Sequence, residues 1–172
     1  MNRILVHTDG GARGNPGPAA IGVVISTEGG PASGGGKKEY AEYIGETTNN
    51  EAEYRALIFA LKKLKQLFGS RKLQEYEIGC YSDSELMVKQ LNGEYKIKEP
   101  GIQRFFVEIW NLKIDLSVPI RFHHVPREEN SGADKLVNQE LDRQSSKLNL
   151  SLFINASIEA FINSCFNEAE VV

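Results

Sequence analysis

The chain has 172 residues, 41% of them hydrophobic and 25% charged, and a formal net charge of −3. This length accommodates one domain with a buried core but excludes two substantial domains. Its apolar runs fall far short of the roughly 20 residues that span a bilayer, and no targeting leader opens the chain, so we expect a cytoplasmic protein without membrane association.

The charge is unevenly distributed along the chain. Residues 145–172 contain one Lys and three Glu, so residues 1–144 carry −1. Four acidic residues of that segment are candidate metal ligands, and without them it carries +3. A phosphate-binding surface is therefore compatible with the acidic total.

The N-terminal part of the chain is predicted to form three strands. Residues 4–9 and 21–27 are β-rich, and the Gly- and Pro-dense segment GGARGNPGPAA between them marks a turn region, so the two runs should pair as a hairpin. Residues 26–36 (STEGGPASGGG) are expected to be flexible, and residues 37–45 alternate as a third strand. A three-stranded meander is the simplest topology.

Helices and strands follow this meander. Residues 47–69 form the clearest helix, which ends at Gly69. Its apolar stripe consists of Leu57, Ala60, Leu61, Leu64 and Phe68. The later elements are a strand at 76–83, a short helix at 84–93, a helix at 101–113, a strand at 118–125 and a last core helix, capped by Asn130, that runs to residue 142. The predicted order is βββαβααβα, which indicates an α/β domain.

Residues 145–172 are predicted to be a C-terminal tail separate from a catalytic domain at 1–144. The stretch SSKLNLS is linker-like, and an amphipathic helix follows it. The apolar face of this helix consists of Ile154, Ile158, Phe161, Ile162, Cys165 and Phe166. It can dock on the chain's own core or contact a partner or a second copy; the chain is expected to be a monomer. Cys80 and Cys165 are expected to be buried thiols, and a disulfide between them stays open.

Three aspartates occupy positions where a carboxylate can stand at the edge of the sheet. Asp9 ends the first strand just before Gly10, although Asp-Gly is also a turn signal. Asp83 follows a strand and precedes a helix, where open αβ sheets bind ligands, with helix capping as the alternative. Asp134 lies in the first turn of the last helix, where an acid also interacts favourably with the helix dipole.

Glu53 is more informative, because it lies on the apolar stripe of the predicted helix, four residues before Leu57. A buried unpaired carboxylate costs several kcal/mol, so a cation, a metal or an opening in the core must meet it. Glu51 lies roughly 200° around the helix, on the face of Arg55 and Lys62, where a solvated acid is expected. Carboxylates on several elements are how a two-metal centre is built, because two divalent ions about 4 Å apart need oxygen ligands from different directions.

Four segments carry these acids in order: HTDGGARGNPGPAAIG, TTNNEAEYRAL, YSDSELMVKQL and REENSGADKLVN. In these motifs, from about Leu5 to Leu141, the chain resembles the type 1 ribonuclease H (ribonuclease HI) family, in a form with a short final loop and no basic protrusion. The resemblance implies a ribonuclease H-like fold, a five-stranded mixed sheet flanked by helices, here with a C-terminal helical extension. It also implies an endonuclease that hydrolyses the RNA strand of RNA–DNA hybrids by a two-metal-ion mechanism and leaves 5′-phosphates.

The resemblance assigns roles to individual residues. The implied catalytic metal ligands are Asp9, Glu53, Asp83 and Asp134, which would hold two Mg²⁺ ions, with Mn²⁺ as a substitute. The implied substrate contacts are Gly10, Gly11, Asn15, Asn49 and Asn50, at the groove where the 2′-hydroxyl identifies the RNA strand. Capping of the following helix is the alternative role of Asn49 and Asn50.

The chain departs from the family pattern in two places. Many relatives have a His in the loop before the last helix, but here that loop reads PREEN, and Arg127 or Glu128 is expected to replace it. His123 and His124 alternate within the preceding strand, where at least one is expected to be packed. The basic helix of some relatives does not fit into NGEYKIKEPG, so hybrid binding is expected to depend on other basic residues. These are Lys89, Lys96, Lys98 and Arg104.

Other functions are compatible with the same fold. A silent nucleic-acid-binding module would lack at least one of the four acids, and all four are present. A nuclease of this architecture could act also or mainly on double-stranded RNA, because fold and metal site alone do not fix the substrate. An actin-like sugar kinase also opens on Asp-Gly after a strand, but it would need about twice this length.

Overall fold

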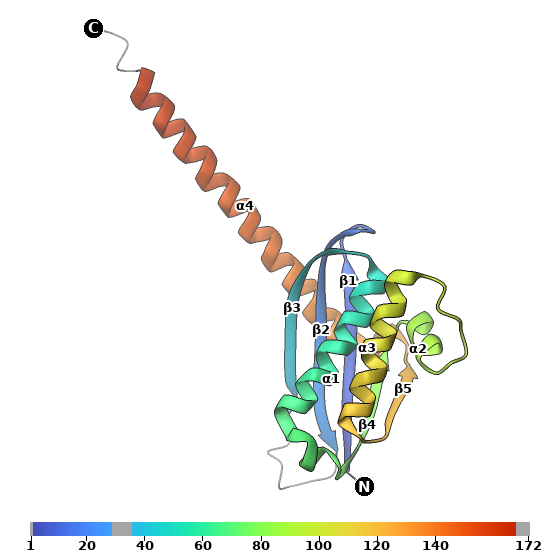
Figure 1. The fold of residues 1–172 in the computed structure, drawn as a ribbon. Helices are drawn as coiled ribbons and strands as arrows, with labels where there is room; N and C mark the ends of the chain where they lie inside the picture. The colour runs from blue at the N-terminus through green and yellow to red at the C-terminus, as the bar shows by residue number, and fades with distance from the viewer. Residues whose placement is uncertain (1, 29–35, 168–172) are drawn as a thin grey trace. The chain divides into compact units, whose positions relative to one another are not determined.

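The computed structural model describes residues 2–28 and 36–167, with side chains described as far as residue 159. It divides into two compact units, Met1–Leu141 and Asp142–Val172 (Figure 1). The elements follow in the predicted order βββαβααβα, with one additional 3₁₀ turn before the last helix. Most of the stretch predicted to be flexible, residues 29–35, lies outside the described residues.

A five-stranded mixed sheet forms the centre of the first unit, in the order β3-β2-β1-β4-β5. Its strands are β1 (Asn2–Ala12), β2 (Gly17–Glu28), β3 (Lys38–Thr47), β4 (Tyr76–Ser82) and β5 (Ile120–His124). The first three pair antiparallel, which confirms the predicted meander, whereas β1 with β4 and β4 with β5 pair parallel. β1 and β2 extend further into the Gly- and Pro-rich segment than predicted, because strand ends tolerate both residues.

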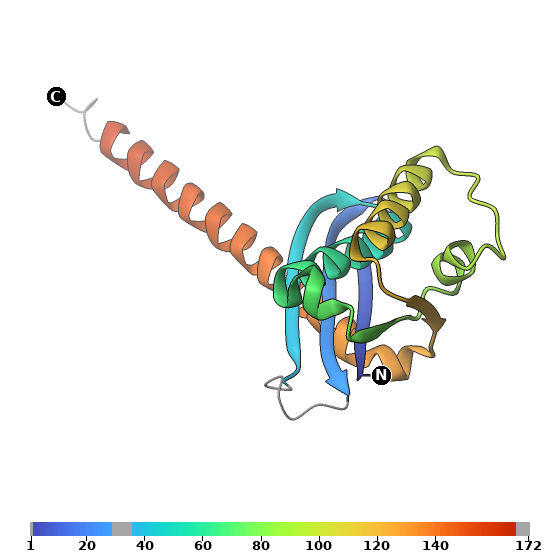
Figure 2. The same ribbon diagram turned by 60° about the horizontal axis from the view of Figure 1, so that its bottom comes forward.

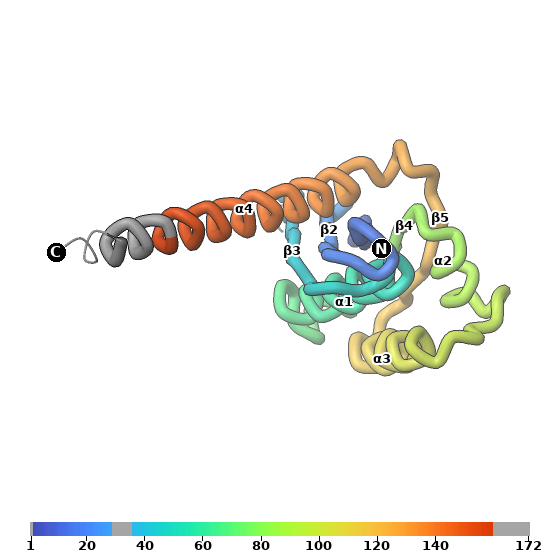
Figure 3. Tube along the Cα trace, turned by 90° about the horizontal axis from the view of Figure 1, so that it is seen from above, coloured from blue at the N-terminus to red at the C-terminus, as the bar shows by residue number. Residues whose placement is uncertain are grey.

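Helices cover both faces of this sheet. They are α1 (Asn49–Leu73), α2 (Glu85–Leu91), α3 (Pro100–Leu116) and α4 (Ser131–Asn167), with the 3₁₀ turn η1 (Arg127–Asn130) before α4. α1 and α3 lie side by side over one face (Figure 2). The first turns of α4 lie on the opposite face, where Val137 and Leu141 pack against Ala20 (Figure 3). α1 is interrupted at Gly69, whose φ of 67° favours glycine, and then continues to Leu73.

The apolar stripe predicted for α1 faces the core. Leu57, Ala60, Leu61 and Leu64 are at most 1% exposed and belong to one cluster with the inward side chains of β1, β2 and β4. Full burial of a large apolar side chain contributes roughly 1.5–3 kcal/mol, so this stripe determines the rotation of α1 about its axis. Glu53 lies on the same stripe and is thereby turned towards the end of β1.

The second unit contains the rest of α4, whose backbone is helical as far as Asn167. The prediction of a linker at residues 145–151 is wrong: the stretch is helical, because it lacks the Gly and Pro that interrupt helices. Of the predicted apolar face, Ile154 and Ile158 are about half exposed. The side chains of its other members, Phe161, Ile162, Cys165 and Phe166, lie outside the described residues.

The thiol of Cys80 is buried in β4, as predicted, and burial raises its pKa to about 12. A disulfide with Cys165 would involve a side chain outside the described residues, so the pairing stays open. Among the helices of the described ranges, none has the length and apolar character needed to cross a membrane.

Candidate active site

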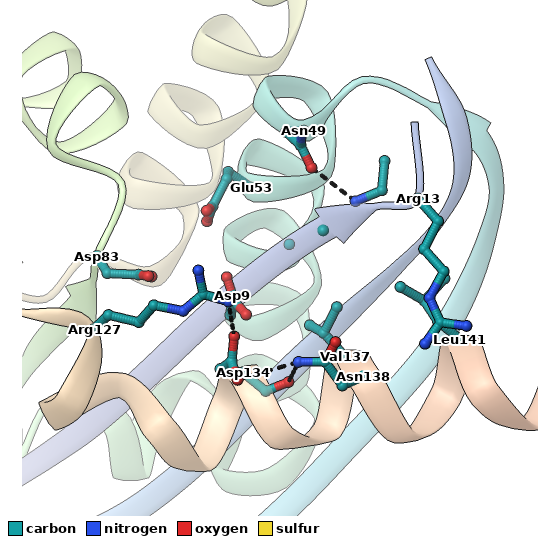
Figure 4. A pocket seen from close by; sticks show the side chains of 13 residues that line it. Asp9, Arg13, Asn49, Glu53, Asp83, Arg127, Asp134, Val137, Asn138 and Leu141 are labelled. Atoms are coloured by element: carbon teal, nitrogen blue, oxygen red, sulfur yellow. Dashed lines mark hydrogen bonds and ion pairs between the residues drawn. The ribbon is translucent and has the colours of Figure 1, made fainter. Parts of the chain in front are cut away.

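Four acidic side chains from four elements converge at one cleft with a volume of about 350 Å³ (Figure 4). Asp9 lies in β1, Glu53 in the second turn of α1, Asp83 just after β4 and Asp134 in the first turn of α4. β1 and β4 are adjacent parallel strands, so Asp9 and Asp83 emerge at the same edge of the sheet. The tertiary fold therefore assembles the four candidates that the sequence placed on separate elements.

β1 and α1 approach each other closely at Gly10. A Cβ atom there would lie 2.1 Å from the carbonyl carbon of Ala52 and 2.3 Å from the backbone nitrogen of Glu53, so only glycine fits. Because this peptide unit of α1 rests on Gly10, the Glu53 carboxylate is held next to Asp9. Gly10, expected only as a substrate contact, thus also has a packing role that shapes the site.

β2 and α4 approach each other in the same way at Gly22, which pairs with Asp9 in the antiparallel ladder. A Cβ atom at Gly22 would lie 2.2 Å from the carbonyl oxygen of Ala133. This contact brings Asp134, the next residue of α4, to the cleft that contains Asp9. Gly22 was not predicted to shape the site, although a glycine within a β-branched run is a signal of close backbone approach.

Three of the four acids form a candidate metal site. One ligand atom from each of Asp9, Glu53 and Asp83 lies within 4.8 Å of the other two. Hard oxygen donors at this spacing suit a divalent cation such as Mg²⁺ or Mn²⁺. Asp9 is only 8% exposed, whereas Glu53 and Asp83 are partly buried, so the ligands combine a fixed position with access from solvent.

The electrostatics of the cluster also favour a bound cation. Burial, followed by the charges of Asp83 and Asp134, raises the pKa of Asp9 from 3.8 to about 6. Burial, followed by the charges of Asp9 and Asp83, raises the pKa of Glu53 well above its usual value. Like charges and desolvation disfavour the ionised carboxylates, and a divalent ion would reverse both effects.

Asp134 is held by two donors instead of joining the group of three. Arg127 donates from Nη2 to Asp134 Oδ1 at 2.5 Å, and Asn138 donates from Nδ2 to Asp134 Oδ2 at 3.1 Å (Figure 4). The hydrogen bond to Asp134, followed by the charge of Asp134, raises the pKa of Arg127 above its usual value. Arg127 therefore lies in the cleft, whereas Glu128, the other expected loop residue, is exposed and is not among the residues that line it.

Asn130 is a second residue whose role the sequence analysis missed. It is fully buried and donates from Nδ2 to the Thr8 carbonyl oxygen at 3.0 Å and to Asp83 Oδ1 at 2.8 Å. Its Oδ1 has no hydrogen-bond partner among the described residues, so the side chain does not cap α4 as predicted. Asn130 instead links the backbone of β1 to the carboxylate of Asp83 and orients that carboxylate.

The expected substrate contacts divide into two groups. Gly10, Gly11 and Asn49 line the cleft, whereas Asn15 and Asn50 do not. Asn49 Oδ1 accepts a hydrogen bond from the backbone of Ala12 at 2.8 Å, and the backbone of Asn49 donates to Asn15 Oδ1 at 3.0 Å. These bonds tie the end of β1 and the following turn to the start of α1.

The cap of α1 is Thr48, whose hydroxyl accepts a hydrogen bond from the backbone of Glu51 at 3.3 Å. The alternative prediction that Asn49 or Asn50 caps this helix is therefore wrong, because the helix begins one residue earlier. Glu51 was expected to be a solvated acid, but its side chain is only 22% exposed and contacts Arg104 Nη2 at 3.4 Å. It also accepts a hydrogen bond from the hydroxyl of Thr47.

His123 and Lys89 are engaged in local contacts, whereas two other basic residues near α2 are exposed. The His123 ring stacks on Tyr81 at 5.0 Å between centroids, as expected for a packed histidine. Lys89 contacts Glu85 Oε1 at 2.7 Å, while Lys96 and Lys98 are exposed.

The comparisons with known proteins agree with this geometry. A family model described as reverse transcriptase-like matches residues 7–140. The solved structure of LC11-RNase H1, isolated from compost, is 49% identical, and the match covers 84% of this chain and 99% of that chain with a TM-score of 0.75. The chain belongs to the type 1 ribonuclease H family. LC11-RNase H1 has also been solved in complex with an RNA/DNA hybrid, and that structure matches at 48% identity with a TM-score of 0.73 over 82% of this chain and 98% of that chain.

Relatives of known sequence extend this result. Ribonuclease HI of Halobacterium salinarum is 40% identical over 144 residues, which cover 81% of this chain and 65% of that protein. Ribonuclease H of Sulfurovum sp. is 31% identical over 157 residues, which cover 85% of this chain and 95% of that protein. A bifunctional protein of Mycobacterium tuberculosis is 36% identical over 140 residues, and the match spans 36% of its length. The resemblance to the family and the fold that it implied are confirmed.

Proposed function

We propose that this ribonuclease H relative is an endonuclease that hydrolyses the RNA strand of RNA–DNA hybrids and leaves 5′-phosphates. The observation that carries the proposal is the convergence of four carboxylates in one cleft, three of them with ligand atoms within 4.8 Å of one another. The complex of the related LC11-RNase H1 with an RNA/DNA hybrid supports this substrate.

Two divalent ions are proposed for the cleft, one of them at the three carboxylates whose ligand atoms lie within 4.8 Å of one another. Asp9, Glu53 and Asp83 would hold one, and Asp134 would hold the other together with Asp9, which would bridge both. Mg²⁺ is the proposed ion, and Mn²⁺ would substitute because it accepts the same oxygen ligands. Bound there, the ions supply an activated water and stabilise the leaving 3′ oxygen.

The chain's own residues position these ligands. Asp9 is held in position because it belongs to the buried strand β1, and Asn130 fixes the orientation of the Asp83 carboxylate by a hydrogen bond. Burial and like-charged neighbours raise the pKa values of Asp9 and Glu53, and a bound cation would favour the ionised form of both carboxylates. Arg127, at the mouth of the cleft, is placed to donate hydrogen bonds to a phosphate oxygen.

Hybrid recognition is assigned to the rim of the same cleft. The backbone at Gly10 and Gly11 allows close approach of a sugar, and Asn49 retains an amide donor for a base edge or a 2′-hydroxyl. Asn15 and Asn50 would act from beside the cleft. Lys96 and Lys98, both exposed, would contact the phosphate backbone.

Double-stranded RNA is the competing substrate, because it shares with the hybrid the wide and shallow minor groove of an A-form helix. A silent binding module is less well supported, since all four acids are present and lie at one cleft. The monomeric state and the cytoplasmic location stay predictions.

The test compares matched RNA–DNA, RNA–RNA and DNA–DNA duplexes with Mg²⁺, with and without EDTA. We expect cleavage of the hybrid's RNA strand, products with 5′-phosphates, and loss of cleavage with EDTA. Preferential cleavage of the RNA–RNA duplex would instead establish the competing substrate. Hybrid binding without cleavage would indicate the silent module.

A further inference from the structure

Both oxygens of the Asp134 carboxylate already have partners within the chain. Arg127 Nη2 contacts Oδ1 at 2.5 Å, and Asn138 Nδ2 contacts Oδ2 at 3.1 Å. The contacts are unequal in kind, because Arg127 carries a full positive charge and Asn138 is neutral. A cation supplied by the chain thus occupies the carboxylate that the proposed function assigns to the second metal ion.

We propose that Arg127 is an internal competitor for this metal position, so that binding of a divalent ion at Asp134 requires Arg127 to leave. The inference rests on the proposed function and adds a control on its metal loading. It predicts unequal ion affinities, because an ion at Asp134 must displace the Arg127 hydrogen bond from that carboxylate.

Direct competition follows from charge and geometry. A guanidinium stays ionised at any working pH, so Arg127 presents a full positive charge to Asp134. Mg²⁺ bonds a carboxylate oxygen at about 2.0–2.1 Å, on lone pairs that also accept the arginine hydrogen bond. Metal coordination and the Arg127 hydrogen bond use the same lone pairs of Asp134 Oδ1, so the ion displaces Arg127 from that oxygen.

The exposure of the two side chains makes the exchange feasible. Arg127 is 72% exposed and Asp134 is 26% exposed, so the arginine can swing into solvent without opening the core. Arg127 lies in the short η1 turn, whereas Asp134 is fixed by the close contact of Ala133 with Gly22. The mobile partner is therefore the arginine, and the displaced guanidinium becomes available for a phosphate oxygen.

The chain contains a matched control. Arg121 contacts Glu77 Oε1 at 2.6 Å, and the side chains are 69% and 21% exposed, almost the same as in the Arg127 pair. This pair bridges β5 and β4, and neither residue is among those that line the cleft. Arg121→Ala therefore removes the same charge and the same kind of exposed ion pair without affecting Asp134.

The experiment measures Mn²⁺ binding to the whole protein without substrate, by counting free Mn²⁺ with electron paramagnetic resonance. An exposed ion pair contributes up to about 1 kcal/mol, which is about a fivefold change in an equilibrium constant. We expect Arg127→Ala to lower the dissociation constant of the weaker Mn²⁺ site about fivefold and to change the tighter site less, because Arg127 makes its hydrogen bond to Asp134 and acts on Asp9 only through its charge. Arg127→Lys should fall between this variant and the wild type, and Arg121→Ala should match the wild type.

Unchanged or weaker binding at the second site of folded Arg127→Ala would overturn the competition, as would an equal gain in Arg121→Ala. Circular dichroism verifies that the variants are folded. We expect Arg127→Ala to fold, because the Arg127 side chain is exposed. Wild-type protein and variants that all fail to bind Mn²⁺ would overturn the proposed two-metal function itself. The two failures are therefore distinguishable.

Discussion

Replacing Asp9 by Asn should abolish cleavage and stabilise the protein in the absence of metal. Asn cannot bridge two cations, so the proposed chemistry is lost. It is nearly the same size as Asp, however, and its amide is uncharged and can donate a hydrogen bond. Burial and like-charged neighbours raise the pKa of Asp9, because they destabilise its ionised form. Asn at this position carries no charge and avoids this destabilisation.

The size of the stabilisation follows from that pKa. A rise from 3.8 to about 6 on folding corresponds to about 3 kcal/mol of destabilisation by the ionised form, at 1.36 kcal/mol per pKa unit. Asp9 is 8% exposed, so solvent screens little of this cost. For a domain of this size, 3 kcal/mol corresponds to roughly 6–12 °C in melting temperature.

The pH dependence has a definite sign. Because the pKa of Asp9 is higher in the folded than in the unfolded chain, the folded state binds more protons between about pH 4 and pH 6, and wild-type stability falls as the pH rises through this window. Asp9→Asn lacks this contribution. The advantage of the variant should therefore be near zero below pH 4 and reach its full value above pH 6.

Thermal melts of both proteins in EDTA, at several pH values, measure this difference. Repeating them with Mg²⁺ should narrow the gap, because ligand binding stabilises the wild type and the variant binds the ion weakly. Equal melting temperatures in EDTA at pH 7, or a larger gap at pH 4, would refute the electrostatic argument. Turnover of the hybrid by the variant near the wild-type rate would refute the metal-ligand role.

Three further substitutions or deletions test other parts of the site. Glu53→Gln should lower the rate of metal-dependent hybrid cleavage by orders of magnitude, whereas Glu51→Gln should lower it little. Equal losses in steady-state assays would show that the position of a glutamate around the helix axis does not decide which one is the ligand. Gly22→Ala should lower the free energy of unfolding in urea by about 1–3 kcal/mol and reduce cleavage, because a Cβ there collides with the backbone of α4. Gly132→Ala is the control: a Cβ there makes ordinary contacts, the nearest at 3.6 Å, so neither the free energy of unfolding nor cleavage should fall. Deleting residues 145–172 should leave the cleavage rate unchanged, because all four acids lie upstream; a folded truncated protein without activity would place the tail at the substrate.

The sequence alone determined the order of elements and the identity of the four acids. For α1 the information lies in apolar periodicity: the stripe from Leu57 to Leu64 specifies both a helix and its buried side, and this places Glu53 towards the core and Glu51 away from it. The other three acids were identified from their positions at the ends of strands and helices and from the family resemblance. Partial burial of Glu51 was not predictable, because its partner Arg104 is far away in the sequence and meets it only in the folded chain. Likewise, SSKLNLS has a linker's polarity but no helix-breaking residue, and polarity alone does not end a helix.

Only the tertiary structure decided how the four acids meet. From the sequence, Gly10 is predicted to be a turn residue and Gly22 a strand residue. In the fold, Gly10 lets the backbone of α1 pack closely on β1 and so brings Glu53 to Asp9, and Gly22 does the same for α4 on β2 and Asp134. The contact of Arg127 with Asp134 has the same origin, since the shape of the turn before α4 selects which charges can touch. Local sequence encodes propensity and phase, whereas distances between elements depend on close packing across the whole core, which no single segment specifies.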